Sequence, residues 1–310
     1  MNRRGQTHRT IPAHAAQRID EARLDGYDVI TKLARGGTST VYLAEDRQTG
    51  ERVAIKTLDP FYVGHSDMVH RLLGEHELAQ RVHHPGVLEI RGADQTAQGI
   101  PYLIMEYLQG ESLTALADRA ALPIETVVAI GAQIASALVA LHAADVVHCD
   151  VKPDNVFVLD APGEDGEPRI KVIDLGVARS GNDPAQDEGT IVGTPAFMAP
   201  EQWRGAPCAK SDVYALGCVL YELISGVPVF AGALPQLMLA HCERMPERLS
   251  VRCASLDPEV ERVVMRALAK DPAMRPTMAD LDDELTRLAP RTQRAHPRGT
   301  GSLTYLDATG

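Results

Sequence analysis

The sequence predicts an α+β fold of two lobes, in which a small lobe built on an antiparallel sheet precedes a larger, mainly helical lobe. Between residues 27 and 107, short runs of β-branched and aromatic residues are bounded by turn residues, a pattern typical of strands. After residue 110, apolar residues recur every three to four positions over long stretches, a pattern typical of amphipathic helices. Because ligands often bind between lobes, this organisation predicts a cleft at the boundary.

The first lobe is predicted to hold five strands and one helix. The strands are expected at residues 27–34, 40–46, 52–58, 87–94 and 101–108, with a hairpin turn at QTG, residues 48–50. The helix is expected at residues 66–83, where Met68, Leu72, Ala79 and Val82 form one apolar stripe.

One acidic residue of this helix falls inside its apolar stripe. Glu75 lies in the middle of the stripe, whereas Glu77 lies on the opposite face. A buried carboxylate is unfavourable unless a cation pairs with it. The lysine that ends the strand VAIK, Lys56, is the predicted partner, and a charge tolerated at the edge of the stripe is the alternative.

The second lobe is predicted to consist of helices interrupted by one hairpin. The helices are expected at residues 124–144, 211–226, 235–244, 258–270 and 278–288, and the hairpin joins VFVLD to RIKVID. The folded unit is predicted to span residues 23–289, divided into lobes at 23–107 and 108–289. The segments 1–22 and 290–310 are polar or rich in Pro, Gly and Arg, and we expect them to be flexible tails.

Composition narrows the classes of partner. The chain has 310 residues with a hydrophobic fraction of 45%, enough for a full core, and a net charge of −11, which disfavours nucleic acid or an anionic membrane as partner. Five cysteines without a C-x-x-C pair indicate a reduced protein without a disulfide framework or zinc site. The apolar run that comes closest to the length of a membrane span, Val213–Ile224, is short and is interrupted by Gly217 and Glu222. We therefore expect no membrane span and a cytoplasmic location. No pattern in the sequence indicates an oligomeric state.

Two features of the first lobe are suited to binding phosphates. In LARGGTSTVYLA, a turn with Gly36 and Gly37 joins two strands, and glycine lets backbone N–H groups approach a phosphate closely. In VAIK, Lys56 points to the same face as Ala54. Taken alone, the glycine turn could be a plain hairpin turn, and Lys56 could be a solvated lysine.

The stretch HCDVKPDN places three functional groups between two apolar runs. The Asp150 carboxylate can accept a proton from a hydroxyl, and the Lys152 ammonium can stabilise a phosphoryl group during transfer. Asn155 and Asp174, the latter at the end of the strand in IDLG, offer oxygen ligands suited to magnesium.

Taken in order, the glycine turn, VAIK, the inward glutamate, HxDxKxxN, DxG and MAPE make the chain resemble a eukaryotic-type (Hanks-type) serine/threonine protein kinase over residues 27–289. The resemblance implies a protein-kinase-like fold and transfer of the γ-phosphate of Mg·ATP to Ser and Thr hydroxyls of protein substrates, this chain included. It implies ATP and magnesium as cofactors, with manganese as a substitute.

The resemblance also implies a role for each matching residue. Asp150 would be the catalytic base, Lys152 the phosphate-stabilising lysine, Asn155 and Asp174 the metal ligands, and Glu75 the partner of Lys56. ATP would be bound by Ala34, Gly36, Gly37, Val41, Ala54, Lys56, Met105, Glu106, Leu108 and Phe157. Thr194, Glu201, Asp212 and Arg275 would support the docking of the protein substrate.

The chain departs from the family pattern at several positions. Ala34 and Ser39 replace two glycines of the loop, and we expect Ala34 to stiffen it. Cys149 replaces the arginine that usually binds a phosphate on the activation loop. Since a thiol cannot form that charge-assisted pair, we hypothesise that the catalytic loop is ordered without activation-loop phosphorylation.

Two other classes of function share this fold. A pseudokinase scaffold would bind partners without transferring phosphate, but Lys56, Asp150, Asn155 and Asp174 are all present. A small-molecule kinase is the third alternative, and the peptide-docking features MAPE, Asp212 and Arg275 argue against it.

Overall fold

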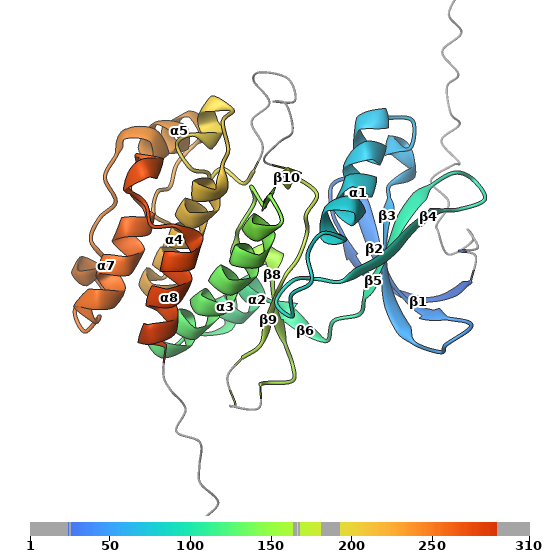
Figure 1. The fold of residues 1–310 in the computed structure, drawn as a ribbon, viewed down its shortest axis with the longest axis horizontal. Coiled ribbons are helices and arrows are strands. Elements are labelled where there is room, and N and C mark those ends of the chain that lie inside the picture. Colours follow the sequence, from blue (N-terminus) through green and yellow to red (C-terminus); the bar gives the residue numbers. More distant parts are fainter. Residues whose placement is uncertain (1–23, 25, 164–165, 167, 181–192, 290–310) are drawn as a thin grey trace, which may run out of the picture.

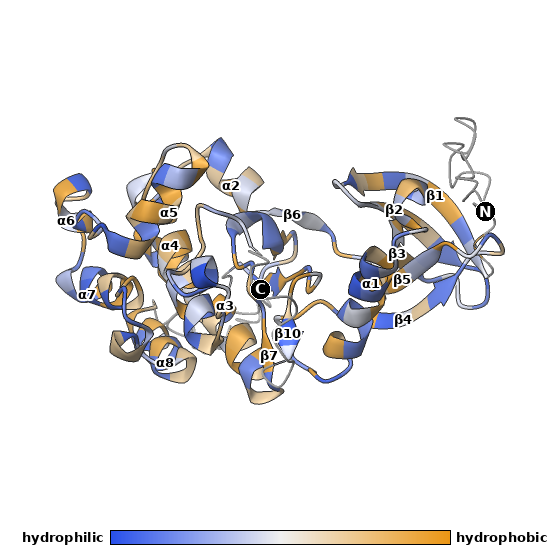
Figure 2. Cartoon of the chain, turned by 90° about the horizontal axis from the view of Figure 1, so that it is seen from above, coloured by the Kyte–Doolittle hydropathy of each residue, from blue (hydrophilic) through white to orange (hydrophobic). Residues whose placement is uncertain are grey.

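The computed structural model describes residues 24, 26–163, 166, 168–180 and 193–289. Within this part of the chain, two lobes lie side by side, the strands β1–β5 with α1 at one end and most of the helices at the other (Figures 1 and 2). This arrangement confirms the predicted fold class. The predicted tails 1–22 and 290–310 lie outside the described residues.

The small lobe is a five-stranded antiparallel sheet in the order β1-β2-β3-β5-β4. Its strands are β1 (Tyr27–Arg35), β2 (Ser39–Asp46), β3 (Arg52–Leu58), β4 (Ile90–Gln95) and β5 (Pro101–Glu106). One face of the sheet buries Ile55 and Tyr102 in a small cluster with Leu24, whereas Ala54 and Leu103 belong to the main core that continues into the large lobe.

The helix α1 (Ser66–Ala79) follows a short 3₁₀ helix, η1 (Pro60–Tyr62), and packs on β4 and β5. It ends four residues earlier than predicted. Its buried residues are Leu72, Glu75 and Ala79, so the carboxylate does face inward with the apolar stripe. The fourth strand also starts later than predicted, because Val87 forms only an isolated bridge to Val172.

The large lobe is built on two buried helices. They are α3 (Ile124–Ala143), which packs against α8 and α4, and α4 (Ala209–Ser225), whose central residues are all buried. The remaining helices are α2 (Leu113–Arg119), α5 (Leu234–Glu243), α6 (Leu249–Arg252), α7 (Pro258–Ala267) and α8 (Met278–Leu288). We did not predict α2 or α6 from the sequence. The first of these is started by the Ser112 side chain, which accepts a hydrogen bond from the N–H of Ala115.

Short strands position the loops of the large lobe. β6 (Gly110–Ser112), β8 (Val156–Leu159) and β9 (Ile170–Val172) form a three-stranded sheet, and β7 (Val146–Val147) pairs with β10 (Arg179–Ser180). The predicted hairpin is therefore present, with a third strand that we did not predict. The remaining 3₁₀ helices are η2 (Pro153–Asn155), η3 (Gln202–Arg204) and η4 (Pro272–Met274).

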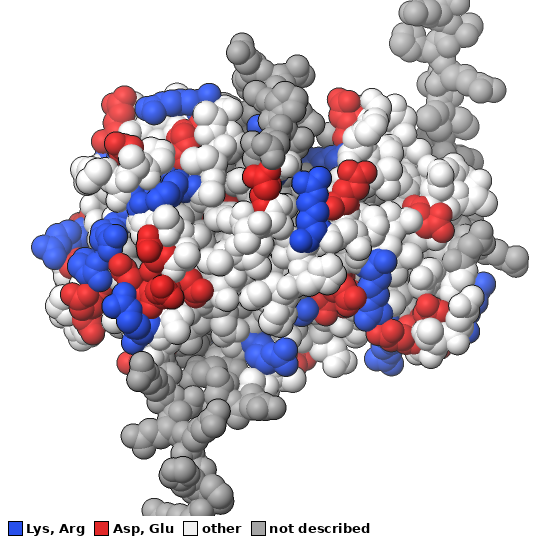
Figure 3. Space-filling view, viewed as in Figure 1, with Lys and Arg blue, Asp and Glu red and all other residues white. Residues whose placement is uncertain are grey.

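The expectation about apolar segments was wrong in one respect. By length and composition, α3 is apolar enough to cross a membrane, and it is a better candidate than Val213–Ile224. However, 61% of its most apolar stretch is buried inside the large lobe, where α3 contacts α4 and α8. Packing in the protein core therefore accounts for its apolar composition. On the face shown in Figure 3, acidic and basic side chains are interspersed among neutral ones.

Candidate active site

The first cluster of the site joins the two lobes through Lys56. On β3, Lys56 extends its Nζ to within 2.8 Å of both carboxylate oxygens of Glu75 on α1. The same nitrogen lies 3.0 Å from Oδ1 of Asp174, which follows β9 in the large lobe. The structure thus brings together three residues that the sequence analysis selected from three separate motifs.

Charge and space both favour this arrangement. Burial opposes the charge of Lys56, but the carboxylates of Glu75 and Asp174 outweigh it and hold the pKa of Lys56 above its usual value. The lysine is therefore a fixed cation at neutral pH. A side chain at Gly176 would not fit, because a Cβ there would lie 2.6 Å from Oε1 of Glu75.

Asp174 combines an ionised carboxylate with access to solvent. Burial raises its pKa, but Lys56 and the N–H of Gly176 lower it more, so the pKa stays below its usual value. The side chain is nevertheless 46% exposed, unlike Glu75 at 6%. Glu75 therefore serves only to hold Lys56, whereas Asp174 remains free to contact a further group.

The second cluster surrounds the carboxylate of Asp150. Its Oδ1 accepts a hydrogen bond from Oγ1 of Thr194 at 2.7 Å, and its Oδ2 accepts one from Nζ of Lys152 at 2.8 Å. Lys152 also donates to Oγ1 of Thr194 at 2.8 Å. The amide nitrogen of Asn155 donates to the Asp150 backbone oxygen at 2.9 Å and to Oδ2 at 3.1 Å. Four predicted residues therefore hold one another in place.

Asn155 links this cluster to Asp174. Its backbone oxygen accepts a hydrogen bond from the N–H of Ile173 at 2.9 Å, which places Asn155 beside the residue before Asp174. Since its Nδ2 donates to Asp150, its Oδ1 is the atom left to accept or to coordinate.

The backbone of residues 148 and 149, directly before Asp150, is fixed from the buried helix α4. The Asp212 carboxylate accepts the N–H groups of His148 and Cys149, each at 2.9 Å, and contacts Nε2 of His142 at 2.8 Å. These bonds support an unfavourable backbone, because Cys149 has a left-handed φ of 65°. Asp174 has φ 66° as well, so left-handed non-glycine residues occur in both clusters.

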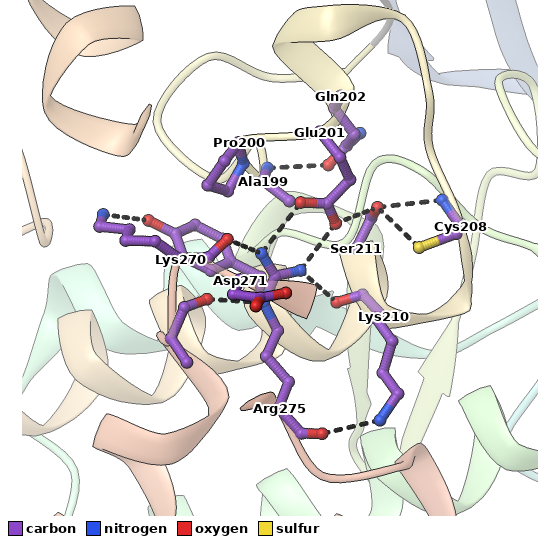
Figure 4. Close-up of polar contacts among 12 residues, drawn as sticks. Ala199, Pro200, Glu201, Gln202, Cys208, Lys210, Ser211, Lys270, Asp271 and Arg275 are labelled. Atoms are coloured by element: carbon purple, nitrogen blue, oxygen red, sulfur yellow. Dashed lines mark hydrogen bonds and ion pairs between the residues drawn. The ribbon is translucent and has the colours of Figure 1, made fainter. Parts of the chain in front are cut away.

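The docking segment, residues 193–201, packs closely against the rest of the large lobe at both of its ends. At its end, Glu201 forms a buried bidentate pair with Arg275, with N···O distances of 2.7 and 2.9 Å (Figure 4). At its start, Gly193 has φ 122°, and a Cβ there would lie 2.9 Å from the Cys149 carbonyl oxygen. That oxygen accepts a hydrogen bond from Gln202 at 2.8 Å. We did not identify Gln202 from the sequence, although it directly follows the MAPE motif.

The glycine turn lies at the tip of the β1–β2 hairpin. Gly36 and Gly37 are exposed there, and the N–H of Gly36 donates to the oxygen of Ser39 at 2.8 Å. Ala34 pairs with Val41, and neither Ala34 nor Ser39 has a positive φ. Alanine is therefore accommodated at this position without backbone strain, and the expectation that it stiffens the loop stays a prediction.

The other predicted ATP-binding residues lie on elements of both lobes. Ala54 and Met105 are paired on β3 and β5 and are nearly buried, whereas Phe157 lies on β8 of the large lobe. The side chain of Glu106 accepts from Lys171 at 2.5 Å and from the N–H of Glu89, which leaves its backbone as the group for a ligand. Leu108 lies in the connection between β5 and β6.

Comparison with known proteins agrees with this geometry. A family model described as the protein kinase domain matches residues 27–284. Serine/threonine-protein kinase Pkn1 of Myxococcus xanthus is 36% identical over 254 residues, which are 81% of this chain and 36% of that protein. Serine/threonine-protein kinase PknB of Mycobacterium tuberculosis is 32% identical over 290 residues, 90% of this chain and 44% of that protein.

Among solved structures, the kinase domain of Mycobacterium tuberculosis PknI has a TM-score of 0.65 and 28% sequence identity, covering 85% of this chain and 96% of that domain. The chain spans roughly two fifths of the length of the curated relatives that it matches. Residues 27–284, with the two clusters described above, show that the chain belongs to the protein kinase domain family.

Proposed function

We propose that this chain transfers the γ-phosphate of ATP to serine and threonine hydroxyls of proteins. The observation that carries the proposal is the cluster of Lys56, Glu75 and Asp174, in which one ammonium is held within 3.0 Å of carboxylates from both lobes. A buried cation that reaches the junction of the lobes is suited to bind the phosphates of a nucleotide.

The other contacts with the nucleotide would come mainly from residues of the small lobe. The exposed backbone N–H groups near Gly36 and Gly37 can approach phosphates closely. Val41, Ala54 and Met105 supply apolar surface above the adenine, and Phe157 supplies it from below. Adenine would then bond to the backbone of the connection that follows β5.

The metal-binding chemistry fits magnesium held mainly by the nucleotide. The part of the chain that the structure describes has no group of three or more His, Cys, Asp or Glu side chains that could hold a metal ion. However, magnesium in such sites is bound by one or two protein ligands together with substrate phosphates. Oδ1 of Asn155 and the half-exposed carboxylate of Asp174 suit this role, and the ion would neutralise charge on the transferring phosphoryl group.

Asp150 is positioned to act on the substrate hydroxyl. Lys152, Thr194 and Asn155 fix the orientation of its carboxylate but do not use all of its lone pairs. The carboxylate can therefore accept the proton of an attacking Ser or Thr hydroxyl, while Lys152 stabilises charge on the phosphoryl oxygens. Nothing favours the pseudokinase alternative, since the residues for transfer are all present and form two hydrogen-bonded clusters that are linked through the backbone of Asn155.

The test is transfer of labelled γ-phosphate from Mg·ATP to the chain itself and to a generic basic protein. The wild-type chain is expected to label both. Asp150→Asn keeps one oxygen, which can accept from Thr194 or from Lys152 but not from both. The amide cannot take the proton, so we expect the rate to fall at least about 10²-fold. Equal labelling by Asp150→Asn and wild type would rule out this mechanism.

Of the three hydroxyl residues Ser180, Thr190 and Thr194, we expect only Thr194 to be needed for full kcat. Thr194→Ala removes two hydrogen bonds of the Asp150 cluster, and we expect about a tenfold lower kcat, with Thr194→Ser recovering most of it. Ser180→Ala and Thr190→Ala are expected to leave kcat unchanged, because Cys149 offers no cation for a phosphate. Thr190 lies outside the described residues.

The measurement is steady-state kcat of each purified variant, with mass spectrometry to record which sites carry phosphate. If Thr190→Ala abolished turnover and an acidic residue at the same position restored it, the hypothesis of phosphorylation-independent activity would fail.

We also propose that the domain works in the cytoplasm. Its five cysteines are free thiols, and ATP as substrate is consistent with a reducing intracellular compartment.

A further inference from the structure

A buried histidine on α5 lies behind the docking segment. His241 is fully buried, and its ring makes edge contacts with Phe230 and Tyr214, at centroid distances of 5.1 and 5.8 Å. Neighbouring Cys242 places its Sγ 4.0 Å from the backbone oxygen of Pro200, so α5 touches the docking segment directly. None of the clusters described above includes this histidine.

The hydrogen bonds around His241 determine where its proton lies. Nζ of Lys270 donates to the hydroxyl of Tyr214 at 3.1 Å, because an ammonium group can only donate. The Tyr214 hydroxyl lies 3.0 Å from Nδ1 of His241, and we assign its own proton to this contact, because its oxygen already accepts from Lys270. Burial, with a smaller effect of Lys270, lowers the pKa of His241 to about 4, so the ring is neutral at pH 7. With this assignment, the single proton of the imidazole lies on Nε2.

Nε2 of His241 is buried and makes no hydrogen bond to any residue that the structure describes. The backbone of Ala196 acts on the ring as an acceptor would, raising its pKa against the effect of burial. Ala196 lies in a turn closed by the bond from the N–H of Phe197 to the oxygen of Thr194. Thr194 in turn donates to Asp150. A buried, unsatisfied donor therefore faces the segment that supports the catalytic carboxylate, and a buried donor favours any shift that gives it an acceptor.

On the basis of the proposed kinase function, we propose that His241 is a positioning residue for protein substrates, whose Nε2–H binds the Ala196 carbonyl oxygen when the docking segment engages the substrate. The chain of contacts from Lys270 through Tyr214 holds the ring so that only Nε2 can donate toward the segment. The nucleotide-binding residues belong to other elements, so the effect is expected on protein substrates and not on ATP.

Two substitutions of His241 distinguish the role of Nδ1 from that of Nε2. His241→Asn keeps an amide near the position of Nδ1 and removes the donor at Nε2, whereas His241→Gln carries an amide N–H toward the position of Nε2. We expect His241→Asn to raise the KM for a basic protein substrate about fivefold, the factor given by one hydrogen bond of ordinary net strength, with the KM for ATP unchanged. His241→Gln is expected to recover most of the loss.

The matched controls are the same two changes at His83, an exposed residue, which should alter neither KM. Tyr214→Phe provides a second variant, since loss of the hydroxyl lets the proton move to Nδ1, and we expect the same selective rise in KM. Thermal melting of each variant gives the folded fraction used to correct the rates.

The proposal is overturned if the Asn and Gln variants bind protein substrate equally well, or if the KM for ATP rises in parallel. It is also overturned if Tyr214→Phe retains the wild-type KM. Failure of the wild-type chain to label any protein would instead refute the proposed function, so the two failures are distinguishable.

Discussion

Asp174→Asn is expected to reduce phosphate transfer by about 10³-fold or more, because a metal ion at the phosphates supplies several kcal/mol of transition-state stabilisation. The substitution keeps the size of the side chain and one acceptor for Nζ of Lys56, which lies 3.0 Å from the present carboxylate. The fold should therefore remain intact, with an unchanged melting temperature. The measurement is γ-phosphate transfer at saturating ATP and increasing magnesium.

The control is Asp283→Asn, which changes an exposed acid on α8 and should have wild-type activity. Binding of a fluorescent ATP analogue provides a second readout, since the wild type should bind it more tightly with magnesium than without, and Asp174→Asn should lose that difference. Transfer at the wild-type rate by Asp174→Asn would contradict the assignment of Asp174.

Arg275→Met is expected to lower the free energy of unfolding by about 3–5 kcal/mol, the usual effect of removing one partner from a buried ion pair. The Arg275 side chain is fully buried, and it also donates to the backbone oxygens of Ala269, Lys270 and Lys210. Its loss leaves those acceptors and the Glu201 carboxylate unpaired (Figure 4). Denaturant unfolding followed by circular dichroism measures the change.

A comparison is Arg262→Met, which removes the contacts of a more exposed arginine with Glu259 and Glu284 and should change stability by less than about 1 kcal/mol. The double variant Glu201→Met/Arg275→Met should be more stable than Arg275→Met alone, because it leaves no unpaired buried charge. Equal stability of the Arg275→Met and Arg262→Met variants would contradict this account.

The buried pair also has a pH dependence of defined sign. Burial raises the pKa of Glu201, but hydrogen bonds from Arg275 and Ser211 lower it more, so the pKa lies below 4.5 in the folded state. The stabilisation is therefore present above pH 4.5 and is lost as the pH falls through the lower, folded-state value. The double variant should lose less stability than the wild type over that acid range.

The features that could be predicted from the sequence each depend on a pattern within a single helix or strand. The inward position of Glu75 followed from an apolar stripe on one helix, and Lys56 followed from the alternation of one strand. The helix α2 was missed because its seven residues are too few for a clear period, and it depends on a cap by Ser112. To predict the fold class it was enough to see that the strand pattern of apolar residues gives way to a helical pattern near residue 110.

The contacts that could not be predicted join residues that are far apart in the chain. Nothing local indicates that Lys270, Tyr214 and His241 meet, because Lys270 follows the end of α7 whereas the other two residues lie on α4 and α5. Similarly, the apolar character of α3 reads equally well as a membrane span or as a core helix until its neighbours are known. Ala34 looked unfavourable because the family pattern has glycine there, but its strand pairing with Val41 shows an ordinary backbone.

The backbone of Cys149 is held from both sides, by Asp212 at its N–H and by Gln202 at its carbonyl oxygen. The Cys149 side chain is therefore not needed to position Asp150. A different residue at position 149 can be accommodated without moving the Asp150 carboxylate. Its left-handed φ of 65° still limits that freedom, because β-branched residues such as valine or isoleucine are strained there. If the hypothesis of phosphorylation-independent activity holds, a single substitution at this position changes the mode of control, provided that the new residue tolerates this backbone.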